Sequence, residues 1–174
     1  MVIRDAVRED AERLLSIYRY YVERTAVTFE LVTPSAEEFG QRISDTLRRY
    51  PYLIAEEDGK VLGYAYAGAF HVREAYRRSC ELSVYLDREQ RRRGIGRALY
   101  LALEERLRAM GILNLYACIG DPVREDEYLT HDSERFHERM GFVRVGTFHL
   151  CGCKFGRWYN MIWMEKLIGE HRPG

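Results

Sequence analysis

The chain has 174 residues, of which 47% are hydrophobic and 31% are charged. These values are typical of one globular domain that is long enough to bury a sizeable core. Lysine plus arginine number 27 and aspartate plus glutamate number 27, so the formal net charge is zero. This balance argues against a general affinity for nucleic acid or anionic membranes, and any anion must bind at a local cluster.

The sequence also carries no sign of secretion, membrane insertion or a metal site. The N-terminal segment MVIRDAVREDAERLL is charged throughout, unlike a signal peptide. No apolar run approaches the roughly 20 residues that span a bilayer. The four cysteines match no zinc or CxxC pattern and are expected to be small buried side chains. They are Cys80, Cys118, Cys151 and Cys153. We therefore expect a cytoplasmic protein without a metal.

The first part of the chain predicts a strand and two helices. A short strand at Val2–Arg4 precedes a helix near Arg8–Arg24, where apolar residues recur at helical spacing. Ser35, with Glu38 three residues later, has the pattern of a capping box. It predicts a second helix that ends near Tyr50.

The middle of the chain predicts strands around a glycine-rich turn into a helix. YLIAEEDGKVLGYAYAGAF has the pattern of a hairpin that turns at Asp58-Gly59. CELSVYL follows as a strand with two distinct faces. One face holds Cys80, Leu82, Val84 and Leu86, and the other holds Glu81, Ser83 and Tyr85. A helix with a buried stripe then runs to Met110, and Gly111 is placed to cap it.

The last part predicts three more strands and a short helix. NLYACIG is a strand, the acidic loop DPVREDEYLTHD leads to a helix near Ser133–Met140, and FVRVGTFHL and WYNMIWMEKL form a final strand pair. The predicted fold class is α/β (α+β). Its sheet is mixed but largely antiparallel, is flanked by helices, and has a strand–helix–strand crossover at its centre. We expect one domain over residues 1–168 and a short polar tail over 169–174.

The stretch Arg91-Arg92-Arg93-Gly94-Ile95-Gly96-Arg97 joins the central strand to its helix. The first N–H groups of a helix have no internal partner, and glycines let an anion approach them. The stretch therefore predicts a phosphate site. It lacks the Lys-Ser/Thr of a P-loop and the GxGxxG fingerprint, which disfavours nucleotide hydrolysis and NAD binding. The alternative is a solvated arginine run before a flexible loop.

The same stretch resembles the coenzyme A pyrophosphate loop of the GNAT N-acetyltransferases, in the form Arg91-x-x-Gly94-x-Gly96. Further segments, in order, resemble the phosphinothricin / methionine sulfoximine N-acetyltransferase branch over nearly the whole chain. They are YAYAG, REAY, ELSVYL, FHERMGF and KFGRWYN. The resemblance implies acetyl-CoA as co-substrate and a homodimer.

The resemblance also implies the residues that hold the cofactor. The central strand would part from its neighbour, and the pantetheine arm would lie in the gap. The residues implied are Val84, Tyr85, Leu86, Arg91, Arg92, Arg93, Gly94, Ile95, Gly96, Arg97, Thr130 and Ser133. One of them departs from the family pattern, because Thr130 stands where an asparagine is usual, after a loop that looks longer. A hydroxyl can still make the contact.

Two residues are candidates for proton transfer. Glu81 matches the family's proposed general base, although its alternative is an exposed strand carboxylate paired with an arginine. His137 matches the histidine of the family's HExxGF motif. A neutral imidazole could shuttle a proton near pH 7, but a histidine hydrogen-bonded inside the fold is an equal alternative.

The acceptor implied by this branch is the primary amine of a small amino acid or analogue. Arg73 is the natural carboxylate clamp, although a solvated charged loop is its alternative. The substrate-binding candidates are Phe29, His71, Arg73, Tyr76, Ser79 and Lys154. Other acceptors remain open: a polyamine, an aminoglycoside or a peptide N-terminus. A third possibility is a domain that binds acyl-CoA as a sensor without turnover.

Overall fold

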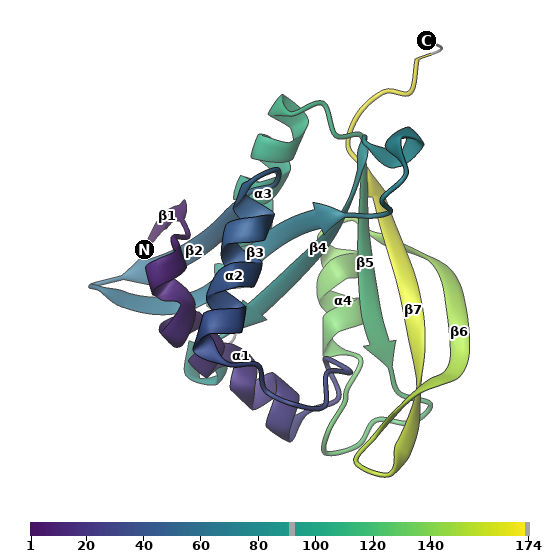
Figure 1. Cartoon of the computed structure of the whole chain (residues 1–174). Coiled ribbons are helices and arrows are strands. Elements are labelled where there is room, and N and C mark those ends of the chain that lie inside the picture. The colour runs from purple at the N-terminus through teal and green to yellow at the C-terminus, as the bar shows by residue number, and fades with distance from the viewer. Residues whose placement is uncertain (91–92, 173–174) are drawn as a thin grey trace.

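The computed structural model describes residues 1–90 and 93–172. These residues form one seven-stranded sheet, in the order β1-β2-β3-β4-β5-β7-β6 (Figure 1). The strands are β1 (Val2–Asp5), β2 (Tyr52–Glu57), β3 (Lys60–Ala69), β4 (Ser79–Leu86), β5 (Asn114–Asp121), β6 (Val143–Lys154) and β7 (Arg157–Leu167). Only β4 and β5 pair in parallel within this sheet. The predicted mixed, mostly antiparallel α/β fold is therefore confirmed.

Helices cover both faces of the sheet. Helices α1 (Ala11–Arg24) and α2 (Ala36–Leu47) lie in front of β2 to β4 in Figure 1. Helices α3 (Ile95–Ala109) and α4 (Asp132–Arg139) lie behind it. Three short 3₁₀ helices complete the elements, at Arg8–Asp10, Glu74–Tyr76 and Arg88–Gln90. No helix in the described part of the chain is long and apolar enough to cross a membrane.

Each helical layer buries one side of the alternating strands. Cys80, Leu82, Val84 and Leu86 of β4 pack into the core with α3. Tyr85, from the opposite face, packs against the cluster formed by α1 and α2. A strand turns successive side chains to opposite faces, so one short segment contributes to two cores. The predicted two faces of this strand are thereby confirmed.

Local signals in the sequence explain where several elements begin and end. Asp58 and Gly59 have φ of 52° and 73°, as both central residues of a type I′ hairpin turn require. The Ser35 side chain accepts a hydrogen bond from the backbone N–H of Glu38 at 3.1 Å, which satisfies a free donor at the start of α2. Gly111, with φ of 78°, follows the end of α3. The final hairpin is longer than predicted, because β6 continues past an irregularity to Lys154.

Strands β4 and β5 part halfway along their length. Their parallel pairing covers Ser79 to Glu81 on β4, and its last register pair joins Glu81 to Tyr116. Beyond that point β4 stays paired with β3 as far as Leu86, and β5 stays paired with β7 as far as Asp121. Each strand follows its own antiparallel neighbour, so their carboxyl halves diverge.

Close contact between β3 and β4 holds one side of this gap in place. A side chain on Gly63 would place its Cβ 2.8 Å from the backbone oxygen of Tyr85 and 2.6 Å from the side chain of Leu86. A Cβ on Gly68, on the same strand, would meet nothing within 4 Å. Gly63 is therefore required for strand contact, whereas Gly68 borders open space.

We expect Gly63→Ala to lower the free energy of unfolding by about 1 to 3 kcal/mol, because backbone must move to accept the new methyl group. Gly68→Ala is the matched control on the same strand, and it should leave stability unchanged or slightly higher. Urea denaturation of both variants measures the difference. Equal stability of the two variants would contradict the close packing at Gly63.

Candidate active site

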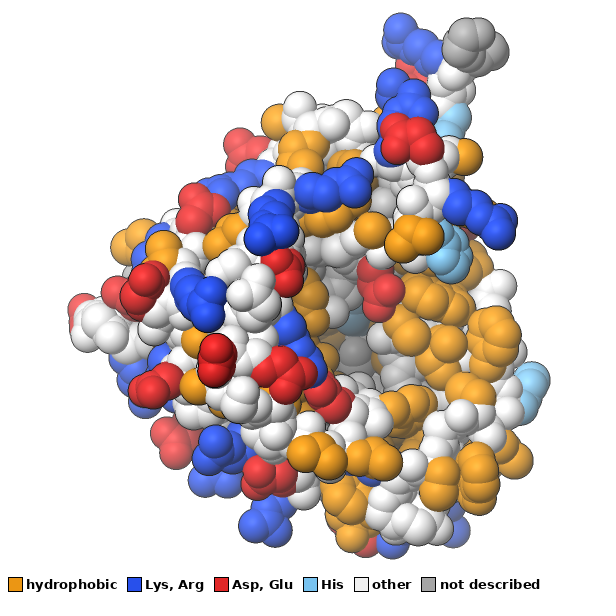
Figure 2. Space-filling model, in the orientation of Figure 1, with side chains coloured by type: hydrophobic (Ala, Val, Ile, Leu, Met, Phe, Trp, Pro, Cys, Tyr) orange, Lys and Arg blue, Asp and Glu red, His pale blue; other side chains and the backbone are white. Residues whose placement is uncertain are grey.

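The gap between the diverging strands contains a cavity of about 50 Å³. Its wall comes from β4, β5, α3, α4 and the loops after α1 and β5. The lining residues are Val27, Leu82, Ser83, Val84, Tyr85, Tyr100, Ala117, Cys118, Ile119, Gly120, Leu129, Ser133 and His137. Figure 2 shows the front of the molecule hollowed between α1 and α2 on one side and β5, β7 and β6 on the other.

A larger groove, of about 740 Å³, lies between α1 and the turn that joins β2 to β3. Its wall carries the ion pair of Arg13 with Asp87, at 2.7 Å, and none of the site residues predicted from the sequence. The smaller cavity is therefore the better candidate for chemistry.

The cavity exposes an edge of β4 that has no neighbouring strand. No register pair between β4 and β5 follows Glu81 in the described chain. Val84, Tyr85 and Leu86 therefore lie on a strand with an open edge, although Tyr21 donates its hydroxyl to the Leu86 oxygen at 2.7 Å. Backbone N–H and C=O groups need partners. An extended ligand with amide groups can supply them in the manner of an added strand.

The N-terminus of α3 lies at the end of β4. Gly94 precedes the helix with φ of 75°, a left-handed conformation that glycine adopts without strain. The first helical bond runs from Ala98 N–H to the Gly94 oxygen at 3.0 Å, so Ile95, Gly96 and Arg97 present free N–H groups to an anion. Gly96 also serves packing, since a Cβ there would lie 3.3 Å from the Phe136 ring of α4.

The arginines of this loop do not act alike. Arg93 donates to Glu57 at 2.6 Å and to Gln90 at 2.5 Å, so its guanidinium is tied to the β2–β3 hairpin. Arg97 is exposed at the first turn of α3. Arg91 and Arg92 lie outside the described residues. Backbone groups and Arg97 therefore offer the anion contacts that the described part of the loop can make.

Glu81 stands where the two strands begin to part. Its register neighbours are Gly68 on β3 and Tyr116 on β5. The side chain is half-buried, and burial raises the pKa of its carboxyl group. Glu81 has no hydrogen bond or ion pair among the described residues, so the paired surface carboxylate considered above is not what the structure contains. The space above Gly68 is open beside it.

His137 is buried, with 3% of its surface exposed. Its Nδ1 lies 2.7 Å from the backbone oxygen of Ser133, which can only accept, so Nδ1 carries the proton. Nε2 is then an acceptor, and the Tyr100 hydroxyl donates to it at 2.9 Å. Burial lowers the pKa of His137 to about 4. The imidazole is therefore neutral at physiological pH.

Tyr100 was missed by sequence reasoning. It lines the cavity from α3 and is 2% exposed. A signal was present, because Tyr100 is four residues after Gly96 and so lies on the same helical face. Cys118 was also missed as a lining residue. The structure exposes its side chain, as it does those of Cys151 and Cys153, so of the four cysteines only Cys80 has the buried position expected from the sequence.

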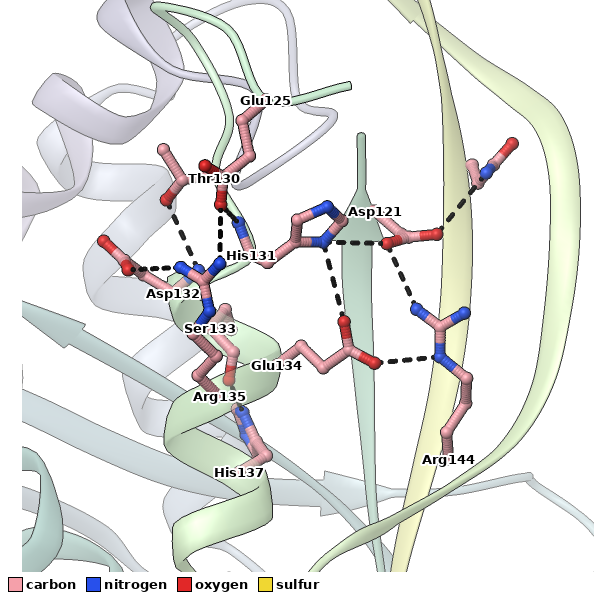
Figure 3. A network of polar contacts seen from close by, with 11 residues as sticks. Asp121, Glu125, Thr130, His131, Asp132, Ser133, Glu134, Arg135, His137 and Arg144 are labelled. Carbon is pink, nitrogen blue, oxygen red and sulfur yellow. Dashed lines mark hydrogen bonds and ion pairs between the residues drawn. The ribbon is translucent and has the colours of Figure 1, made fainter. Parts of the chain in front are cut away.

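Thr130 and Ser133 flank the start of α4, and only Ser133 lines the cavity. Thr130 is exposed, and its hydroxyl accepts from the N–H of Asp132 at 3.3 Å. Figure 3 shows that His131 and Glu134 of the same turn meet Asp121 and Arg144 in a network of ion pairs.

The predicted substrate residues fall into two groups. His71, Arg73 and Tyr76 are exposed on the loop between β3 and β4, and Ser79 begins β4. Phe70 fastens this loop by stacking on Tyr116, with ring centroids 4.1 Å apart. The loop therefore lies beside Glu81. The Arg73 side chain has no hydrogen bond or ion pair within the described chain.

Phe29, which follows α1, and Lys154, which ends β6, lie near the carboxyl end of β5. Phe29 stacks on Tyr159 and lies against Gly120 and Gly152. The Lys154 ammonium donates to the Thr28 oxygen at 2.7 Å, and burial lowers its pKa to about 8. Thr28 follows Val27, which lines the cavity. The structure does not bring this pair into contact with the loop that carries His71 and Arg73.

Comparison with known proteins agrees with this geometry. The acetyltransferase (GNAT) domain model matches residues 3–163. The L-methionine sulfoximine/L-methionine sulfone acetyltransferase of Pseudomonas aeruginosa is 37% identical over 166 residues, which cover 94% of this chain and 92% of that protein.

Two solved structures are similar over nearly their whole length. The phosphinothricin acetyltransferase of Sinorhizobium meliloti, in complex with AcCoA, superposes with a TM-score of 0.89 at 36% identity, covering 99% of this chain and 92% of that one. The ribosomal-protein-alanine N-acetyltransferase of Brucella melitensis has a TM-score of 0.87 at 35% identity, with coverage of 96% and 99%. The chain therefore belongs to the GNAT family of N-acetyltransferases, enzymes whose co-substrate is acetyl-CoA.

Proposed function

We propose that this enzyme acetylates the primary amine of a small amino acid or analogue, such as phosphinothricin or methionine sulfoximine, by direct attack of the amine on the thioester. The observation that carries the proposal is Glu81. It is a half-buried carboxylate without a partner among the described residues, and it lies where β4 and β5 part. The relatives named for methionine sulfoximine and phosphinothricin support this acceptor class.

The residues present fit the co-substrate, which supplies the acetyl group as an activated thioester. The open edge at Val84, Tyr85 and Leu86 would pair with its amide-containing arm. Free N–H groups at Ile95, Gly96 and Arg97 would hold the pyrophosphate, favoured by the helix dipole. Ser133 and Thr130 would contact it from α4. Arg91, Arg92 and Arg93 stay predictions from the sequence as phosphate contacts, and Arg93 would first have to leave Glu57.

Glu81 acts in this proposal as the general base. An alkyl ammonium has a pKa far above that of an ordinary carboxyl group. Burial raises the pKa of Glu81 and narrows this difference. A carboxylate without a competing partner can accept the ammonium proton directly or through one water. The open space above Gly68 gives the amine room to reach it.

His137 acts through Tyr100 in this proposal. Both ring nitrogens of His137 are engaged, Nδ1 by Ser133 and Nε2 by the Tyr100 hydroxyl. Tyr100 lines the cavity, so its hydroxyl is the nearer group for delivering a proton to a leaving thiolate. His137 would fix the place of that hydroxyl through Nε2. The hydroxyl would turn from Nε2 to give its proton to the thiolate and would regain a proton from water.

The acceptor would lie on the front face, between Glu81 and the loop that carries His71, Arg73 and Tyr76. Arg73 has no partner in the described chain, which leaves its guanidinium available for a carboxylate. Ser79 would line the same space. Lys154 and Phe29 would close the far end, where the lowered pKa of Lys154 reflects burial rather than an ion pair.

A homodimer is the proposed assembly. The β6–β7 hairpin exposes Phe148, Leu150 and Trp158, each more than half accessible. Hydrophobic side chains gather over β5, β7 and β6 in Figure 2, and a contiguous apolar surface of this kind favours association. The domain over residues 1–168, the tail over 169–174 and the cytoplasmic location stay predictions from the sequence.

Thiol release from acetyl-CoA should be fastest with methionine sulfoximine, methionine sulfone or phosphinothricin in a panel that includes polyamines, aminoglycosides and a peptide with N-terminal alanine. Glu81→Gln should lower kcat by about 10² to 10⁴, the usual share of a general base, and should leave acetyl-CoA affinity unchanged. Glu165→Gln, on β7 two strands away in the same sheet, is the control. A preference for the peptide would show that the acceptor is not a small amino acid. Full activity of Glu81→Gln would show that Glu81 is not the general base.

The unfolding free energy should fall as pH falls from about 6.5 to about 4, by up to about 1.4 kcal/mol per pH unit from His137 alone. The sign follows because the folded pKa lies below the unfolded one, so the unfolded chain binds the proton first. His137→Gln should remove this part of the slope, whereas exposed His149→Gln should not. Denaturant melts across this pH range test the point, and parallel slopes for wild type and His137→Gln would contradict it.

Light scattering at micromolar concentration should give about twice the 20.6 kDa chain mass if the exposed hairpin forms a dimer. Trp158→Glu should shift the mass to that of a single chain. Leu101→Glu, an exposed apolar position on α3, should not. A monomeric wild type would refute the dimer.

A further inference from the structure

A network of charges joins the end of β5 to the start of α4. Asp121 is the last residue of β5 and is 5% exposed. His131 and Glu134 belong to the first turn of α4, and Arg144 comes from β6. Figure 3 shows the four side chains converging from these elements. The network therefore links segments that are distant in the sequence.

The nitrogen and oxygen atoms of this network that could act as ligands would suit a cation. One nitrogen of His131 and one carboxylate oxygen each from Asp121 and Glu134 lie within 4.8 Å of one another. Arg144 already supplies positive charge there. Its Nη2 lies 3.2 Å from Asp121 Oδ1 and its Nε lies 2.9 Å from Glu134 Oε1. The guanidinium thus spans both carboxylates, as its forked geometry allows.

The bridged residues adjoin the cavity. Asp121 follows Gly120, and Glu134 follows Ser133, and both of these neighbours line the cavity. His137 lies one helical turn after Ser133 and donates to its oxygen. A shift of α4 relative to β5 would therefore move Ser133 and His137 together. Arg144 itself does not line the cavity.

We propose that Arg144 is a positioning residue for acetyl transfer, because its guanidinium bridge between Asp121 and Glu134 sets the place of α4 against β5. The inference rests on the roles proposed above for Ser133 and His137. Sequence spacing could not reveal it, because the bridge joins side chains from three separate elements, β5, α4 and β6.

Four proteins test this inference: wild type, Arg144→Ala, Arg144→Lys and the control Arg135→Ala. Arg135 lies on α4, the helix that the Arg144 bridge holds. Its pairs with Glu125 and Asp132 are at the surface, where ion pairs contribute little. Calorimetry gives the Kd for acetyl-CoA, thermal melts give Tm, and thiol release gives KM and kcat separately. Kd needs no knowledge of the amine.

Arg144→Ala should weaken acetyl-CoA binding at least about tenfold, since small misplacements of binding groups are costly, and should lower Tm. Arg144→Lys keeps a positive charge but cannot span both carboxylates. It should therefore recover most of the Tm while its Kd stays weak. Arg135→Ala should match wild type in both.

Two results would overturn the inference. One is an Arg144→Ala variant that binds acetyl-CoA like wild type. The other is an Arg144→Lys variant that recovers Kd along with Tm, because affinity would then follow stability alone. Failure of the proposed function would give a different result, because wild type would then bind acetyl-CoA but release no thiol with any amine of the panel. The order of Kd values across the variants would still decide the role of Arg144.

Discussion

The divergence of β4 and β5 is the constraint on which the site depends. A parallel pair of strands in the middle of a sheet would ordinarily pair along its full length. Here each strand is held by its outer neighbour, β4 by β3 as far as Leu86 and β5 by β7 as far as Asp121. The backbone groups left between them lie in the interior of the fold, where an unpaired polar group is costly. The fold thus keeps a place for an extended ligand.

The catalytic candidates take their properties from their distance to this gap. Glu81 belongs to the last register pair, so it is partly buried and also next to open space. His137 and Tyr100 lie deeper, in a region dry enough to keep the imidazole neutral. Burial raises the pKa of the Glu81 carboxyl group and lowers the pKa of the His137 imidazole. Such a pair of opposite shifts is common where protons are transferred.

Much of the fold could be predicted from the sequence, because its signals are local. The Asp58-Gly59 turn, the Ser35 cap and the alternation along β4 each depend on neighbouring residues only. The GNAT family and its cofactor were also predicted, since the Arg91-x-x-Gly94-x-Gly96 pattern is contiguous. The partner of each side chain was not predictable in the same way. The pairing of Arg93 with Glu57, of Tyr100 with His137 and of Arg144 with Asp121 joins elements that only the fold brings together.

The open edge of β4 also couples the stability of this enzyme to metabolism. A ligand that binds the folded chain alone shifts the unfolding equilibrium, by about 2.7 kcal/mol when its concentration is a hundred times its Kd. Acetyl-CoA would supply backbone partners along the open edge of β4, beside the Leu86 groups that Tyr21 already holds, so the fraction of folded enzyme would rise and fall with the supply of activated acetyl groups. In a cell short of acetyl-CoA, that part of the stabilisation would be lost and more of the chain would be unfolded.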